Sequence, residues 1–236
     1  MSGNPLLIAH AVKLATFLAL MGILARRRYR TSFLFPTYLL AILTGNALVS
    51  FWPATFFTQW FWILKQAVYD ILKLGIALEL AFRIFRAFPG THRRALMACS
   101  TVLGITTFAI INSGMVGVST PVMHDYYPRV SAGTIWLMTA IVALVAWYRL
   151  PVERFHRAIL LGFSSYLLVF TTLLNLLREW GFQTMFRFFD SWSNVAYLAV
   201  MLWWAWAAVR PDGEPEVVPA TLLDRLVPVA PATQRA

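Results

Sequence analysis

The chain has 236 residues, of which 59% are hydrophobic and only 13% are charged. Soluble domains average about 45–50% hydrophobic and about 25% charged residues, so a soluble globular enzyme is excluded. The formal net charge of +10 would by itself suggest nucleic-acid binding, but the basic residues lie in short segments between apolar runs. The single cysteine, Cys99, excludes a disulfide framework and a multi-cysteine metal site.

Seven apolar runs in the chain are long enough to form membrane-spanning helices, which need about 20 mainly apolar residues. The sequence therefore predicts an all-α fold, a bundle of seven transmembrane helices that occupies residues 1–210. The seven runs are 6–24, 33–51, 58–85, 95–116, 132–147, 158–177 and 189–209.

The distribution of basic residues predicts the orientation of the bundle. Fourteen of the 20 Lys and Arg residues fall in the first, third and fifth connections and in the tail, whereas the alternate connections hold Arg129, Arg178 and Arg187. Because Lys and Arg concentrate on the cytoplasmic side, the N-terminus is expected outside and the C-terminus in the cytoplasm. We therefore expect a multi-pass protein of the cell inner membrane. Its arginines would contact anionic lipid headgroups and not nucleic acid.

Two segments fall outside the apolar runs. Residues 117–130 are polar enough to lie outside, as a cap over the bundle, and residues 211–236 form a Pro-rich cytoplasmic tail. The tail is too short for a domain and is expected to be disordered. With no output domain attached, a sensor of this kind would need a separate partner, in the membrane or in the cytoplasm.

The third run carries the most informative polar residues. Gln66, Asp70 and Lys73 share one face of a helix, and the Asp70–Lys73 spacing of i,i+3 permits direct contact. Both charges would lie near the middle of the bilayer, where ionisable groups are costly. The sequence therefore predicts a buried pair, and it leaves architecture and function equally open as the reason for it.

A second pair lies nearer the cytoplasmic end of the same run. Glu79 and Arg83 have the i,i+4 spacing of a helical ion pair and fall on the opposite face from Asp70. An ion pair at the membrane interface is a common structural feature. We interpret this second pair as structural.

Other polar residues of the runs lie mostly in the predicted outer half. All three lysines of the chain, Lys13, Lys65 and Lys73, lie inside apolar runs, and Lys13 lies near the middle of its run with His10 closer to the outside. Asn46 lies in the outer half of the second run. Together with the Asp70 group, these residues predict a polar cavity open to the outside, in which an excess of lysine would favour a small anionic ligand.

One short match relates the two halves of the chain. Tyr38-Leu39-Leu40 and Tyr166-Leu167-Leu168 occupy comparable places in the second and sixth runs. Three residues within apolar helices are too few to establish a repeat. A plan of three helices, a linker helix and three helices remains compatible with the topology.

Several cofactors and reactions lack the residues they require. The topology resembles that of microbial rhodopsins, but the last run has no lysine for a retinal Schiff base. His10 is the only histidine within a run, so a bis-histidine haem is not expected. Serine-hydrolase, P-loop and dinucleotide motifs are absent from the sequence, and no metal-ligand set is evident. No cofactor and no enzymatic activity are predicted.

Two functions from different classes remain. The first is a ligand-sensing or ligand-binding module, or a subunit of a membrane complex. The alternative is a small secondary transporter that uses a midplane Asp/Lys site. A transporter also needs polar positions in the inner half to form an exit path, and the sequence shows few, which favours the first function.

Overall fold

The computed structural model describes residues 5–86, 127–147 and 152–211, together with residues 97, 100, 101 and 104. The regular elements of this part of the chain are all helices. The elements, in chain order, are α1 (Pro5–Ala25), η1 (Arg28–Arg30), α2 (Leu34–Phe51), α3 (Pro53–Phe56), α4 (Gln59–Arg86), α6 (Tyr127–Trp147), α7 (Arg154–Trp180) and α8 (Phe182–Val209).

Four of these helices are long and apolar enough to cross a membrane. The apolar segments are Leu7–Ala25, Leu34–Phe51, Arg154–Leu177 and Arg187–Val209, and α6 adds the shorter stretch Thr134–Val145. Helix α4 is 28 residues long, about 42 Å at roughly 1.5 Å per residue. It is therefore long enough to span, but Lys65, Asp70 and Lys73 lie along its first 15 residues.

The helices follow the predicted runs at the start of the chain and extend beyond them later. Helices α1, α2 and α4 begin and end within one residue of the expected bounds, whereas α6, α7 and α8 begin four to seven residues earlier. Polar side chains such as Arg154 and His156 can continue a helix beyond its apolar part. Of the run 95–116 only residues 97, 100, 101 and 104 are described, all helical. Residue Cys99, residues 117–126 and the tail from residue 212 lie outside the described residues.

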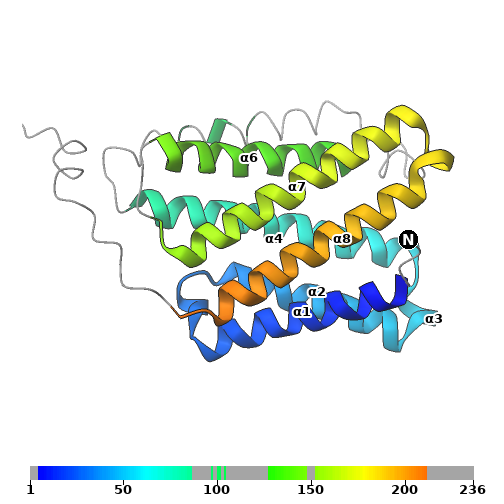
Figure 1. The fold of residues 1–236 in the computed structure, drawn as a ribbon, viewed down its shortest axis with the longest axis horizontal. Coiled ribbons are helices and arrows are strands. Elements are labelled where there is room, and N and C mark those ends of the chain that lie inside the picture. The colour runs from blue at the N-terminus through cyan, green and yellow to red at the C-terminus, as the bar shows by residue number, and fades with distance from the viewer. Residues whose placement is uncertain are drawn as a thin grey trace, which may run out of the picture.

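The first and last helices pack side by side, although they are far apart in the sequence (Figure 1). Small residues form much of this contact, so the two backbones approach closely. A Cβ atom added at Gly22 of α1 would lie 3.0 Å from the Ala208 side chain of α8. Helix α8 in turn pairs with α7 through a one-residue turn at Gly181, where φ is 85° and a side chain would be strained.

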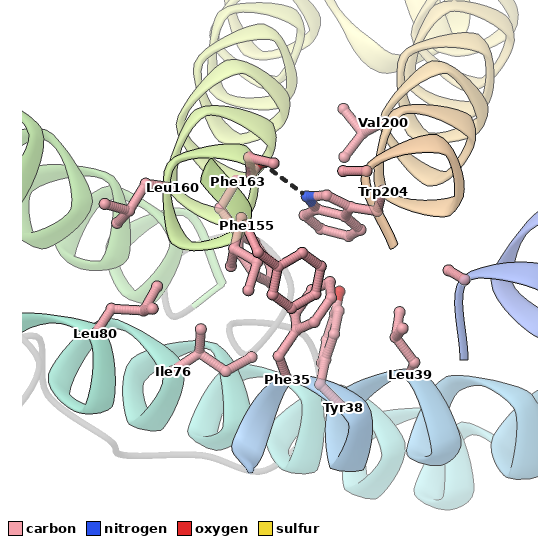
Figure 2. Close-up of a cluster of buried hydrophobic side chains, with 14 of the residues drawn as sticks. Phe35, Tyr38, Leu39, Ile76, Leu80, Phe155, Leu160, Phe163, Val200 and Trp204 are labelled. Atoms are coloured by element: carbon pink, nitrogen blue, oxygen red, sulfur yellow. Dashed lines mark hydrogen bonds between the residues drawn. The ribbon is translucent and has the colours of Figure 1, made fainter. Parts of the chain in front are cut away.

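An aromatic layer forms part of the buried apolar core (Figure 2). It consists of Phe35 from α2, Phe155 and Phe163 from α7, and Trp204 from α8, and all four side chains are buried. The Phe35 ring lies edge-on to the other three at centroid distances of 5.9, 6.2 and 5.0 Å. Such contacts fix the relative rotation of α2, α7 and α8.

The outward faces of the long helices are apolar as well. Large side chains such as Trp136, Leu168 and Leu202 expose more than half of their surface. In water such faces would favour aggregation, whereas lipid chains would cover them. The exposed surface therefore supports the same conclusion as the helix lengths, that this is a membrane protein.

The two ends of the bundle differ in charge. One end, here called the Arg-rich end, holds the last turns of α1 and α8, the first turns of α2 and α7, and Arg28, Arg154, Arg157 and Arg210. The first turn of α1 lies at the opposite end (Figure 1). Three of the Arg-rich segments that the sequence predicts on one side of a membrane, those of Arg28, Arg154 and Arg210, thus lie together in space.

Candidate functional site

A buried ion pair lies within the helix bundle. The Lys73 ammonium donates a hydrogen bond to Asp70 Oδ1 at 2.8 Å, and the two side chains are 8% and 10% exposed. The Gln66 amide donates to the same oxygen at 3.4 Å. The contact expected from the i,i+3 spacing is therefore present, and one face of α4 carries all three groups.

A cluster of four tyrosines, three of them from other helices, lies next to this pair. The Tyr38 ring of α2 lies 6.1 Å from that of Tyr69 on α4, and the Tyr166 ring of α7 lies 5.3 Å from that of Tyr197 on α8. A side-chain hydrogen bond joins Tyr197 to Tyr38, and Tyr166 lies within electrostatic range of Asp70. We call the three groups of α4 and these four tyrosines the polar centre. It draws on four helices.

A glycine allows α2 to approach the polar centre closely. A Cβ atom at Gly45 would lie 2.5 Å from the Tyr69 hydroxyl oxygen and 2.9 Å from Cδ of Lys65. The same hydroxyl donates to the Ala41 carbonyl at 3.3 Å. Any larger residue at position 45 would displace Tyr69 or Lys65, so the small residue is required by the close approach.

The other three predicted site residues lie elsewhere. The Lys13 ammonium of α1 donates to the Ser50 hydroxyl of α2 at 2.8 Å. Asn46 is half-buried one turn before Ser50 on α2, and His10 is an exposed residue one turn before Lys13. The predicted six-residue cluster is therefore divided: Gln66, Asp70 and Lys73 are in contact, whereas the remaining three lie along α1 and α2, towards the end opposite the arginines.

The second ion pair of α4 joins two helices. Oε1 of Glu79 lies 2.9 Å from a guanidinium nitrogen of Arg83, as the i,i+4 spacing predicts. The Glu79 carboxylate also accepts the Ser32 hydroxyl at 2.9 Å and the backbone N–H groups of Phe33 and Leu34 at 2.9 and 3.0 Å. Because these N–H groups open α2, the Glu79 carboxylate caps that helix from another part of the chain.

A cavity of about 360 Å³ lies at the Arg-rich end. We call it the arginine pocket. Its basic residues come from three segments that are far apart in the sequence. In the sequence, these arginines indicated only the orientation in the membrane. The lining residues of the pocket are Arg28, Arg154, Phe155, Arg157, Ala158, Leu161, Trp203, Trp206, Ala207, Arg210 and Pro211.

The tyrosines of the polar centre were not among the site residues that the sequence predicted. The matched positions of Tyr38 and Tyr166 in the two halves of the chain were the available signal. The structure places both in the polar centre, together with Tyr197. Three matched residues within apolar helices could not distinguish this convergence from coincidence.

No protein-family model, curated protein or solved structure matches this chain. Within the described residues, no group of three or more His, Cys, Asp or Glu side chains could hold a metal ion. Function must therefore be inferred from the chemistry of the polar centre and the arginine pocket.

Proposed function

We propose that this protein is a non-enzymatic ligand-binding or ligand-sensing module of the inner membrane, with a seven-helix bundle and an external N-terminus. The observation that carries the proposal is the buried Asp70–Lys73 pair at 2.8 Å, with Tyr166 of α7 within electrostatic range of Asp70. An ionisable residue within a membrane bundle is by default a functional candidate, because apolar residues would satisfy the same packing at lower cost.

The contacts of the pair suggest how binding would be transmitted. A small anion that reached Lys73 would compete with Asp70 for the ammonium group. Asp70 would then be left in a low-dielectric environment, near the Tyr166 hydroxyl of α7. Tyr166 in turn clusters with Tyr197 of α8 and, through it, with Tyr38 of α2. Rearrangement at the pair would therefore shift α4 relative to these helices. A partner protein in the membrane or the cytoplasm would detect that shift.

The aromatic layer favours binding over transport. Phe163 lies 5.4 Å from Tyr38 of the polar centre and 4.6 Å from Trp204, and Phe155 lines the arginine pocket. Packed rings therefore lie between the polar centre and the pocket at the Arg-rich end. This arrangement supports a one-sided site that opens away from the arginines.

A secondary transporter is the alternative function. It is favoured by the origin of the polar centre, since groups from four helices converge between the ends of the bundle. Transporter sites are built in this way at helix interfaces near the bilayer midplane. Transport would require the aromatic layer to open during the cycle.

The orientation can be tested by reporter fusions. Fusions after Arg28 and after Arg94 should both report a cytoplasmic location, because each follows an Arg-rich segment. A fusion at either position that reports the outside would contradict the helix count and the proposed topology.

Binding can be tested by the thermal stability of the purified full chain in mild detergent. We would add chloride, phosphate, acetate, succinate and citrate in turn, and compare the wild type with an Asp70→Asn/Lys73→Met double variant. The double variant Arg187→Met/Asp190→Asn is a matched control. It also removes one basic and one acidic residue three positions apart on a helix, but both are exposed residues of α8. At least one anion should raise the Tm of wild type and control but not of the polar-centre variant. If every anion that raises the Tm does so equally in all three proteins, the proposed site is contradicted.

The same anion distinguishes the two functions. Protein reconstituted in liposomes should bind the radiolabelled anion without accumulating it inside if the protein is a binding module. Uptake that is lost in the Asp70→Asn/Lys73→Met variant would instead establish the transporter.

A further inference from the structure

The arginine pocket is lined by four guanidinium-bearing residues from three segments of the chain. Arg28 follows α1, Arg154 and Arg157 belong to the first turn of α7, and Arg210 follows α8. A cavity of about 360 Å³ lies between them, within the usual size range of small-ligand sites. None of the residues that line it in the described chain is acidic.

Two of these arginines are held in place by the protein. Arg28 is 5% exposed and donates to the Ala207 carbonyl at 2.9 Å and to the Arg210 carbonyl. Its guanidinium lies 4.9 Å from the centre of the Phe155 ring. The Arg210 guanidinium lies 4.6 Å from the centre of the Trp206 ring. Cation–π contacts of this kind restrain a guanidinium without neutralising its charge.

Glu153, the residue before α7, contacts a histidine. Glu153 is exposed, and its carboxylate lies 3.4 Å from Nδ1 of His156. The other ring nitrogen of His156 lies 3.0 Å from the Thr31 carbonyl. Arg154 and Arg157 are exposed, and the residues that line the cavity in the described part of the chain include no carboxylate, so the site favours an anion. Bidentate arginine contacts suit phosphate oxygens in particular.

The wall of the pocket is apolar and reaches the outside of the bundle. Leu161 of α7 and the two tryptophans Trp203 and Trp206 of α8 line it, and they are 43%, 40% and 50% exposed. Trp203 also donates to the Ala158 carbonyl at 3.2 Å, which holds its indole against α7. The site therefore joins a cationic end to a surface that lipid chains would cover.

We propose that the arginine pocket binds the phosphate group of an anionic phospholipid, with the acyl chains lying along Leu161 and Trp203. A soluble phosphate ester shares the same charge chemistry but would leave the apolar wall unused. The proposal is independent of ligand binding at the polar centre, because it rests on different residues at the Arg-rich end.

The experiment measures retained lipid by native mass spectrometry of the full chain, purified in neutral detergent with phosphatidylcholine and a minor fraction of phosphatidylglycerol. The test variant is Arg154→Gln/Arg157→Gln. Both side chains are exposed and neither is the N-cap residue of α7, so the variant is expected to fold. The matched control is Arg26→Gln/Arg27→Gln, which removes two exposed charges from the same end but outside the pocket. Size-exclusion profiles and Tm values serve as the test that both variants fold.

Wild type and control should each retain one phosphatidylglycerol in preference to phosphatidylcholine. The pocket variant should bind it about thirtyfold more weakly, because two arginine contacts are lost. An equal loss in the control would show diffuse surface attraction and overturn the site, as would unchanged binding in the pocket variant. Glycerol 3-phosphate is the soluble competitor: continued retention of the lipid assigns the site to phospholipid, whereas complete displacement at micromolar concentration assigns the phosphate site to a soluble ester.

Discussion

Helix α4 carries two ion pairs that hold their charges in different ways. Asp70 and Lys73 satisfy each other within one helix and are almost fully buried. Glu79 has an exposed partner in Arg83, but the same carboxylate accepts three hydrogen bonds from residues 32–34. Arg83 in turn donates to the Arg30 carbonyl at 3.0 Å.

The two pairs differ in what they contribute to the fold. The Asp70–Lys73 pair places two charges in the interior, whereas Glu79 connects α4 to the start of α2. Joining two helices gives Glu79 a structural purpose that accounts for its presence. The Asp70–Lys73 ion pair lies within one helix, and it reaches another helix through Tyr166 of α7, which lies within electrostatic range of Asp70. A charge pair in the interior of a helix bundle is costly, and this cost is why we propose a functional role for it.

Breaking the buried pair should have the largest effect. Lys73→Met leaves the Asp70 carboxylate without its ammonium partner in a low-dielectric environment, and we expect a loss of about 3–5 kcal/mol in the free energy of unfolding. Asp70→Asn should have a similar effect on Lys73. Unfolding by SDS titration in mixed micelles measures both.

The double variant sharpens this result. Asp70→Asn with Lys73→Met leaves no buried charge behind, so it should cost much less than the sum of the two single variants. Additive losses in the free energy of unfolding would show that the two side chains do not interact in the folded protein. A stable double variant that has lost anion binding would support a functional role for the pair.

Removal of the Glu79 carboxylate should rank second. Glu79→Gln weakens the cap on α2 as well as the contact with Arg83, and we expect a cost of about 2 kcal/mol. The loss should concentrate at the start of α2, where hydrogen exchange of the Leu34 amide should accelerate. Unchanged exchange there would contradict the proposed cap.

Crowding the polar centre should have an intermediate effect. Gly45→Ala places a methyl group against the Tyr69 hydroxyl, and we expect a cost of about 1–2 kcal/mol. Tyr69→Phe removes that oxygen, so the Gly45→Ala/Tyr69→Phe variant should recover part of the loss. Without recovery, the steric contact between α2 and α4 would not explain the effect.

Removal of the exposed cation should have the smallest effect. The Arg83 side chain is 38% exposed, so Arg83→Gln should cost less than about 1 kcal/mol. High salt should reduce the difference further. A loss as large as that of Lys73→Met would overturn the distinction between the two pairs.

The amino-acid sequence determined the local features of this protein. Long apolar runs specify the helices, and their bounds are confirmed within one residue for α1, α2 and α4. The contacts of Asp70 with Lys73 and Gln66, and of Glu79 with Arg83, were predictable because they lie within one helix. Helical periodicity alone brings such residues together.

The contacts between helices were decided by the tertiary structure alone. Periodicity does not specify which helices are neighbours or how each is rotated about its axis, and side-chain packing such as that of α1 against α8 decides both. Lys13 therefore contacts Ser50 and not the Asp70 group, and Glu79 reaches the start of α2. For the same reason, arginines from three distant segments surround one pocket.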